Sequence, residues 1–130
     1  MGMRERPGQV RRITDTPFGY TLSLISGKWK MVILYLLAEN KIVRYNELRR
    51  MIGSVTFKTL SAQLKELEAD DLIVRKEYLQ IPPKVEYSLS EKGESLIPIM
   101  EAMCDWGALQ RNKSEVSCAS RHSKTGPIGG

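Results

Sequence analysis

Histidine and cysteine are scarce in this sequence of 130 residues, which contains one histidine, His122, and two cysteines, Cys104 and Cys118. The cysteines form no Cys-x-x-Cys pair, so the chain offers neither a disulfide framework nor a four-cysteine metal site. The histidine lies in a polar C-terminal stretch, and residues 13–110 hold no imidazole base, no paired carboxylates and no glycine-rich phosphate loop. We therefore expect a protein that is not an enzyme and that needs neither a metal nor a cofactor.

Long hydrophobic runs are also lacking. The longest, Met31–Ala38, is eight residues long, whereas a helix that spans a membrane needs roughly 18 residues. The stretch Met1–Arg12 is polar and lacks the apolar segment of a secretory signal. Together these features predict a cytoplasmic protein with no membrane partner.

Positive charge is in moderate excess and is unevenly distributed. The formal net charge is +5 at pH 7, with basic excess in residues 1–15 and 111–130 and acidic excess in residues 81–110. The two ends are also poor in apolar side chains, and a segment that cannot bury apolar surface does not fold on its own. The sequence thus predicts a flexible basic arm at 1–12, one domain at 13–110 and a disordered tail from 111 onward.

Capping residues and apolar spacing predict the first two helices. Either Asp15 or Thr16 can cap a first helix that Pro17 opens, since proline is favoured at the first helical position. Gly27 is expected to end this helix. The following segment, Lys28–Asn40, is apolar nearly all round, which is typical of a central, buried helix.

A helix–turn–helix unit is expected next. A minimal strand at Ile42–Tyr45 precedes a third helix, which Asn46 can cap and Gly53 can end. Thr56 can cap a fourth helix that runs to about Asp70. The short connection between these two helices is typical of a tight helix–turn–helix.

The fourth helix has one apolar face and one small, polar and basic face. Leu60, Leu64 and Leu67 recur at helical spacing and should face the core. The opposite face consists of Lys58, Ala62 and Lys65, flanked by Thr59, Ser61 and Glu66. Such a face suits a helix that lies in a groove of its ligand, and an ordinary amphipathic surface helix is the alternative.

Two strands follow the fourth helix. Ile73–Gln80 is rich in strand-forming residues, and Val85–Leu89 alternates apolar and polar side chains as a half-buried strand does. Pro82 and Pro83 make the connection between them stiff and projecting. A helix–turn–helix followed by such a hairpin is a winged helix, whose helix enters the major groove of DNA while the wing reaches phosphates or the minor groove. The expected fold class is mainly α with a small β-wing.

The last helix is expected to begin after the cap Ser90, with Pro98 starting a second segment or kinking it. Between Leu96 and Trp106 only Glu101 and Asp105 are charged. A domain of this size seldom buries so apolar a helix alone, so we expect it to form a twofold homodimer together with the first helix. The expected interface residues are Leu22, Ile99, Met100, Met103 and Trp106. Burial within the helix's own domain is the alternative.

Five segments of the sequence resemble HxlR-type transcriptional regulators, a family of winged helix–turn–helix proteins related to the MarR group. They are Thr21–Trp29, Arg44–Leu48, Leu60–Glu68, Ile81–Leu89 and Trp106–Gly107. The Gly-Lys-Trp triplet and the Pro-Pro-Lys-Val-Glu-Tyr wing are the most specific matches. The resemblance implies a homodimer that binds an inverted-repeat operator through two winged helices.

Carried over position by position, the resemblance implies a recognition helix at Thr56–Asp70 and a basic wing residue at Lys84. Many members of the family place a cysteine directly before the proline that opens the first helix, and some use it to sense electrophiles or oxidants. That position is Thr16 here, so the resemblance gives no support for a thiol sensor at the N-terminus. Cys104 and Cys118 are the remaining thiols, and neither has an obvious basic neighbour that would lower its pKa.

The expected function is sequence-specific DNA binding by a homodimeric transcriptional regulator. The residues expected at the DNA are Thr56, Lys58, Thr59, Ser61, Ala62 and Lys65 in the major groove, with Lys84, Lys76 and Arg49 at phosphates. Trp29 and Tyr87 are expected in the core, and Glu47 is expected to hold structure through a hydrogen bond or salt bridge. The alternative is a winged helix used for protein–protein contacts without specific DNA binding. Double-stranded DNA, a second copy of the chain and a small-molecule effector of unidentified chemistry are the expected partners.

Overall fold

A computed structural model describes residues 12–111 of the chain. Its elements in chain order are the 3-10 turn η1 (Ile13–Asp15), α1 (Pro17–Ile25), α2 (Lys30–Asn40), β1 (Val43–Arg44), α3 (Tyr45–Ile52), α4 (Phe57–Ala69), β2 (Ile73–Tyr78), β3 (Lys84–Leu89), α5 (Glu91–Glu94) and α6 (Ile97–Arg111). All but the last residue of the predicted N-terminal arm 1–12, and all but the first of the predicted tail 111–130, lie outside the described residues. Cys118 and His122 lie outside them as well.

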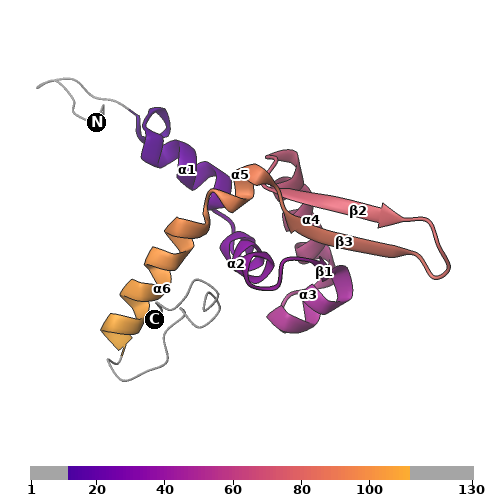
Figure 1. The fold of residues 1–130 in the computed structure, drawn as a ribbon. Coiled ribbons are helices and arrows are strands. Elements are labelled where there is room, and N and C mark those ends of the chain that lie inside the picture. The colour runs from indigo at the N-terminus through magenta and orange to yellow at the C-terminus, as the bar shows by residue number, and fades with distance from the viewer. Residues whose placement is uncertain (1–11, 112–130) are drawn as a thin grey trace, which may run out of the picture.

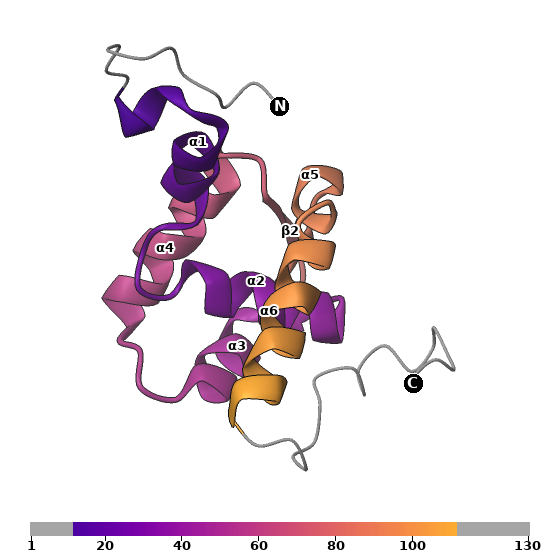
Figure 2. The same ribbon diagram turned by 90° about the vertical axis from the view of Figure 1, so that its left-hand side faces the viewer.

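The fold is a winged helix, mainly α with a small antiparallel sheet, as the sequence predicts. The sheet has the strand order β1–β3–β2, and β2 and β3 pair along their whole lengths from Ile73 opposite Leu89 to Tyr78 opposite Lys84. These two strands extend beyond the helices as a narrow ribbon, the wing (Figure 1). Both ribbon views place α2 at the centre of the domain, with α6 packed along one side of it (Figures 1 and 2).

The core forms where α2, α4 and the sheet meet. The predicted leucine face of α4 is confirmed, because Leu60, Leu64 and Leu67 are all buried. Tyr87 is also buried, and Trp29 packs against the core from its edge. The other buried hydrophobic side chains are Ile33, Leu34, Leu37, Val43, Leu48, Val55, Leu72, Ile73, Leu96 and Met100. This core holds α4 from one side only and leaves its opposite face in solvent.

Three predicted helix caps are confirmed by hydrogen bonds. The side chain of Thr16 accepts one from the backbone N–H of Gly19 at 3.0 Å, with Pro17 at the first helical position. Thr56 accepts one from Thr59 at 3.1 Å at the start of α4. Ser90 caps α5 in the same way. These side chains satisfy N–H groups that a helix start otherwise leaves without a partner.

The predicted cap at Asn46 is wrong. Helix α3 begins at Tyr45 with its cap position at Arg44, two residues before the predicted cap. Arg44 pairs with Glu86 in the sheet, and this pairing keeps its backbone extended until the helix starts. The predicted structural role of Glu47 is confirmed, since its Oε1 accepts a hydrogen bond from the backbone N–H of Arg44 at 3.4 Å.

The structure corrects one further helix boundary and decides between two predicted alternatives at another. The central helix begins at Lys30 rather than Lys28, because Gly27 has a φ of 147° and the chain turns there before the helix can start. Pro98 is the second residue of α6, so it starts a second helical segment after the short α5. Among the described residues, no single helix is long and apolar enough to span a membrane.

Candidate nucleic-acid interface

Helix α4 is presented to solvent by the turn that joins it to α3. Gly53 ends α3 with a φ of 87°, a conformation that favours glycine, and Val55 is buried beneath the turn. With its leucines in the core, α4 exposes Lys58, Ala62 and Lys65 on its outer face. This is the small and basic surface that the sequence predicts for the fourth helix.

Ser61 lies on the flank of α4 that faces the sheet, and its side chain is only partly exposed. Its Oγ is 3.1 Å from the hydroxyl oxygen of Tyr45, which also donates a hydrogen bond to the carbonyl oxygen of Phe57 at 3.2 Å. Tyr45 therefore ties the start of α3 to the first two turns of α4. Thr59, on the other flank, is exposed.

Phe57 is a candidate contact that the sequence does not predict. It is the first residue of α4 and 61% exposed, with its ring packed at a tilt against Tyr45 at a centroid distance of 5.4 Å. Its place three residues before Leu60 suits the apolar face of the helix, so periodicity alone offers no sign that it reaches the surface. The N-terminal residues of a recognition helix are those that meet base edges, and phenylalanine can contact a thymine methyl group.

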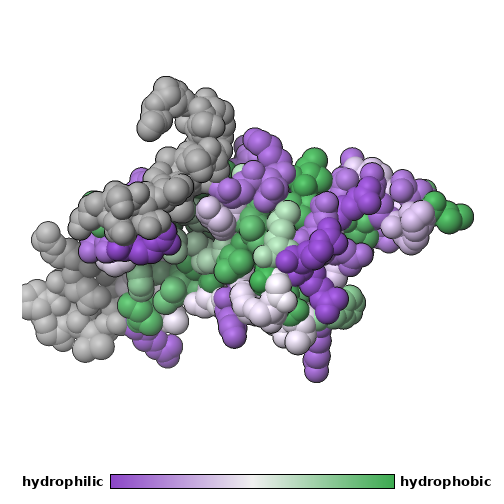
Figure 3. Space-filling model, turned by 90° about the horizontal axis from the view of Figure 1, so that it is seen from below, coloured by the Kyte–Doolittle hydropathy of each residue, from purple (hydrophilic) through white to green (hydrophobic). Residues whose placement is uncertain are grey.

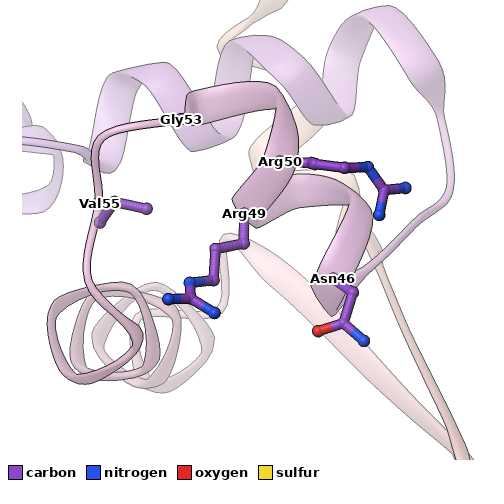
Figure 4. Close-up of a pocket in the computed structure, with 5 residues that line it drawn as sticks. All are labelled: Asn46, Arg49, Arg50, Gly53 and Val55. Atoms are coloured by element: carbon purple, nitrogen blue, oxygen red, sulfur yellow. The ribbon is translucent and has the colours of Figure 1, made fainter.

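A polar depression of about 400 Å³ lies beside the helix–turn–helix. It is lined by Asn46, Arg49, Arg50, Gly53 and Val55, and Figure 4 shows the two arginine side chains extending to different sides of α3. The sequence predicts a phosphate contact for Arg49 but not for Arg50 or Asn46. The adjacent arginines at the end of α3 are the sequence signal for this site. Both line the depression with the Asn46 amide, and all three side chains can bind phosphate oxygens.

On the wing, neighbouring side chains hold Lys84, whereas Lys76 remains exposed. The ammonium of Lys84 lies 4.2 Å from the ring centre of Tyr78 and 3.6 Å from a carboxylate oxygen of Glu86. Lys76 lies 5.3 Å from the same ring and is exposed. At the tip, Leu79 and Ile81 are each 97% exposed, and the far end of the ribbon is hydrophobic in the space-filling view (Figure 3).

A second depression of about 390 Å³ lies between α4 and the base of the wing. Its polar lining includes Lys65 and Glu68 from the helix and Arg75 and Tyr87 from the strands. Burial raises the pKa of Tyr87, and a hydrogen bond with Arg75 opposes that shift. Arg75 lies opposite Tyr87 in the sheet, and both side chains line this depression.

Four of the five predicted interface residues are exposed on α1 and α6. The exposed fractions are 43% for Leu22, 45% for Ile99, 55% for Met103 and 67% for Trp106. Met100 differs: it is 4% exposed, because its face of α6 packs on the core. It forms part of an apolar groove of about 280 Å³ rather than an outward contact, and the groove is also lined by Met31, Val32, Tyr35, Met103 and Cys104.

Comparison with known proteins identifies the family. The model of the HxlR-like helix-turn-helix family matches residues 24–115. The chain belongs to the HxlR-like helix-turn-helix family. An HTH-type transcriptional regulator of Halalkalibacterium halodurans is 63% identical over 112 residues, which cover 86% of this chain and 99% of that protein. The regulator YdzF of Bacillus subtilis is 57% identical over 99 residues, 76% of this chain and 91% of that protein.

Solved structures agree with this assignment. The HTH-type regulator YtcD matches with a TM-score of 0.70 and 47% identity over 73% of this chain and 96% of that one. The redox regulator HypR in its reduced form matches with a TM-score of 0.71 and 45% identity over 75% and 95% of the two chains. This HxlR-like protein is thus a transcriptional regulator with a helix–turn–helix DNA-binding fold, and its family consists of regulators rather than enzymes.

Proposed function

We propose that this HxlR-like protein is a homodimer that binds an inverted-repeat operator in the cytoplasm and thereby regulates transcription. The observation that carries the proposal is the outer face of α4, where Lys58, Ala62 and Lys65 are exposed while the leucines opposite them are buried. The turn at Gly53 and the Thr56 cap hold this helix at the surface of the domain.

In the proposed complex, α4 lies in the major groove. Lysine can donate to the O6 and N7 atoms of guanine, and the Ala62 methyl can contact a thymine methyl. Phe57 adds an apolar contact at the N-terminal end of the helix, where its ring is held by Tyr45. Thr56 and Thr59 supply hydroxyl groups beside it, and Ser61 contributes from the flank.

Phosphate contacts are proposed on both sides of the recognition helix. Arg49 and Arg50 with Asn46 line the depression beside α3, and Lys76 is exposed on the wing. Lys84 is a weaker candidate, because Glu86 and the Tyr78 ring already hold its ammonium group. Such contacts fix the orientation of the protein on the duplex without reading its sequence.

The homodimer is proposed from the apolar surface of α1 and α6. Besides the predicted residues, Phe18, Tyr20 and Leu109 are each more than half exposed there. Large apolar patches of this kind mark interaction sites, and a twofold axis through them places two recognition helices on one duplex.

Two measurements test the proposal. Fluorescence anisotropy with a duplex from the protein's own promoter is expected to give tighter binding than random duplex at about 150 mM salt. Equal affinity for both duplexes would contradict operator binding and would favour a protein–protein role for the winged helix.

Sedimentation of Met103→Glu is expected to show a monomer, because the substitution buries a charge at the interface. An unchanged dimer would remove α6 from that interface.

A further inference from the structure

Lys30 is a buried lysine that joins the central helix to the recognition helix. It is the first residue of α2, and its side chain is 6% exposed. Its Nζ lies 2.6 Å from a carboxylate oxygen of Glu66, which is in the third turn of α4 and whose side chain is 57% exposed. The ion pair thus has one end inside the domain and the other at the surface.

The aliphatic part of the Lys30 side chain packs closely against its neighbours. A Cβ atom added at Gly27 would lie 3.0 Å and 3.1 Å from the stem carbons of Lys30 and 2.7 Å from Oε1 of Gln63. The backbone of the α1–α2 connection therefore closes over the lysine directly. From this enclosed position, the ammonium group of Lys30 reaches Glu66 on α4.

The two ends of the pair are not equivalent. A buried ammonium that loses its partner is strongly destabilised, whereas a carboxylate at the surface can be solvated by water. Loss of the Lys30 charge therefore leaves Glu66 as a carboxylate that water can solvate but that has lost its partner. Loss of the Glu66 carboxylate instead leaves a charge in the interior.

The charge of α4 gives this pair its significance for DNA. The helix contains Lys58 and Lys65 but also Glu66 and Glu68, so it has no net charge of its own. Glu66 follows Ala62 by four residues, which puts it one turn further along the same side of the helix as the proposed groove contact. A free carboxylate there would repel the phosphates that the lysines attract.

We propose that Lys30 is a positioning residue that holds the Glu66 carboxylate against the domain and so leaves a net positive recognition face on α4. This role rests on the proposed function, because it concerns the approach of α4 to DNA. The proposed role predicts that a variant without both charged partners binds DNA better than a variant without Lys30 alone. A role in folding alone does not predict this difference.

The test compares three variants in operator binding. Lys30→Met keeps an apolar stem in the core and is expected to weaken operator affinity by about tenfold, the size of one lost charged contact. The double variant Lys30→Met/Glu66→Gln is expected to recover affinity to within about threefold of the unmodified protein. The matched control Lys28→Met removes the same charge from an exposed position two residues away and is expected to weaken binding less than Lys30→Met.

Salt dependence separates charge from packing. Because repulsion by a free Glu66 is screened, the defect of Lys30→Met is expected to shrink as salt rises from about 50 to 200 mM. Unchanged affinity in Lys30→Met, or a double variant as weak as the single one, would overturn the proposal. If the unmodified protein shows no operator preference, the proposed function itself has failed.

A second variant covers the case in which Lys30→Met does not show a cooperative thermal transition. Glu66→Gln keeps an oxygen that can accept a hydrogen bond from Lys30, so the lysine retains a partner. If the carboxylate is already held away from DNA, this variant is expected to bind the operator within about threefold of the unmodified protein. An affinity gain of about tenfold would show that Glu66 opposes DNA in the native protein, and would overturn the proposal.

Discussion

The recognition helix and the wing both contain lysines, but Lys84 on the wing is already bound by neighbouring side chains. On α4, Lys58 and Lys65 are exposed, and no ion pair to either is found within residues 12–111. On the wing, Lys84 is bound to Glu86 and Tyr78, and Arg75 is bound to Glu77 at 3.2 Å. The number of basic residues in a segment therefore does not measure the positive charge that is available to a ligand.

The two regions also differ in how much of their apolar surface is buried in the domain. Leu64, on the inner face of the recognition helix, is 2% exposed, whereas Leu79 at the wing tip is 97% exposed. Leu64→Ala is expected to lower the free energy of unfolding by about 2–5 kcal/mol, because it leaves a cavity in the core. The control Leu79→Ala is expected to change it by less than about 0.5 kcal/mol. Urea unfolding followed by circular dichroism measures both changes. Equal effects would contradict the packing of α4 on the core through Leu64.

Operator affinity should show the same contrast. Lys58→Ala is expected to lose about 1–3 kcal/mol of binding free energy if the lysine meets a base. Lys84→Ala is expected to lose less than about 1 kcal/mol, because its ammonium group is already shared with Glu86. Anisotropy titrations of both variants on one operator measure the difference. A larger loss for Lys84 would reverse the ranking of helix and wing.

The capping of α4 should matter locally. Thr56→Ala removes the acceptor for the N–H of Thr59 and is expected to cost about 1 kcal/mol of unfolding free energy. Thr56→Ser keeps the acceptor and serves as the matched control. Thermal unfolding of the pair measures this effect, and a Thr56→Ala variant as stable as Thr56→Ser would show that the cap contributes nothing.

The smallest expected effect concerns Lys76 on the wing. If Lys76 contacts one phosphate, Lys76→Ala should flatten the plot of log affinity against log salt by about one unit. The exposed and uncharged Gln80 lies on the same wing, and Gln80→Ala is expected to leave the slope unchanged. An unchanged slope for Lys76→Ala would remove the wing lysine from the DNA contact.

Much of the fold could be predicted from the sequence, because its signals are local. The leucine spacing at 60, 64 and 67 identified the buried face of α4, and Thr16, Thr56 and Ser90 identified three helix starts. The predicted cap at Asn46 is wrong, because sheet pairing at Arg44 sets the start of α3. Pairing between distant segments here overrides the local capping preference of asparagine.

The candidate interface was less predictable, because its details depend on contacts between distant segments. Phe57 lies on the apolar side of α4 by periodicity, yet its ring is exposed beside Tyr45. Met100 belongs to a helix that looks uniformly apolar, and only its packing on α2 shows which way it faces. The Lys30 ion pair joins residues far apart in the chain, and no spacing rule links them.

Selection of bound fragments from random DNA tests the central claim most directly. We expect an enriched inverted repeat whose half-sites are centred about 10 base pairs apart, or a multiple of that distance, because two recognition helices related by a twofold axis meet successive major grooves. Enrichment of a single half-site would contradict the dimer. Recovery of no common sequence would contradict sequence-specific DNA binding itself.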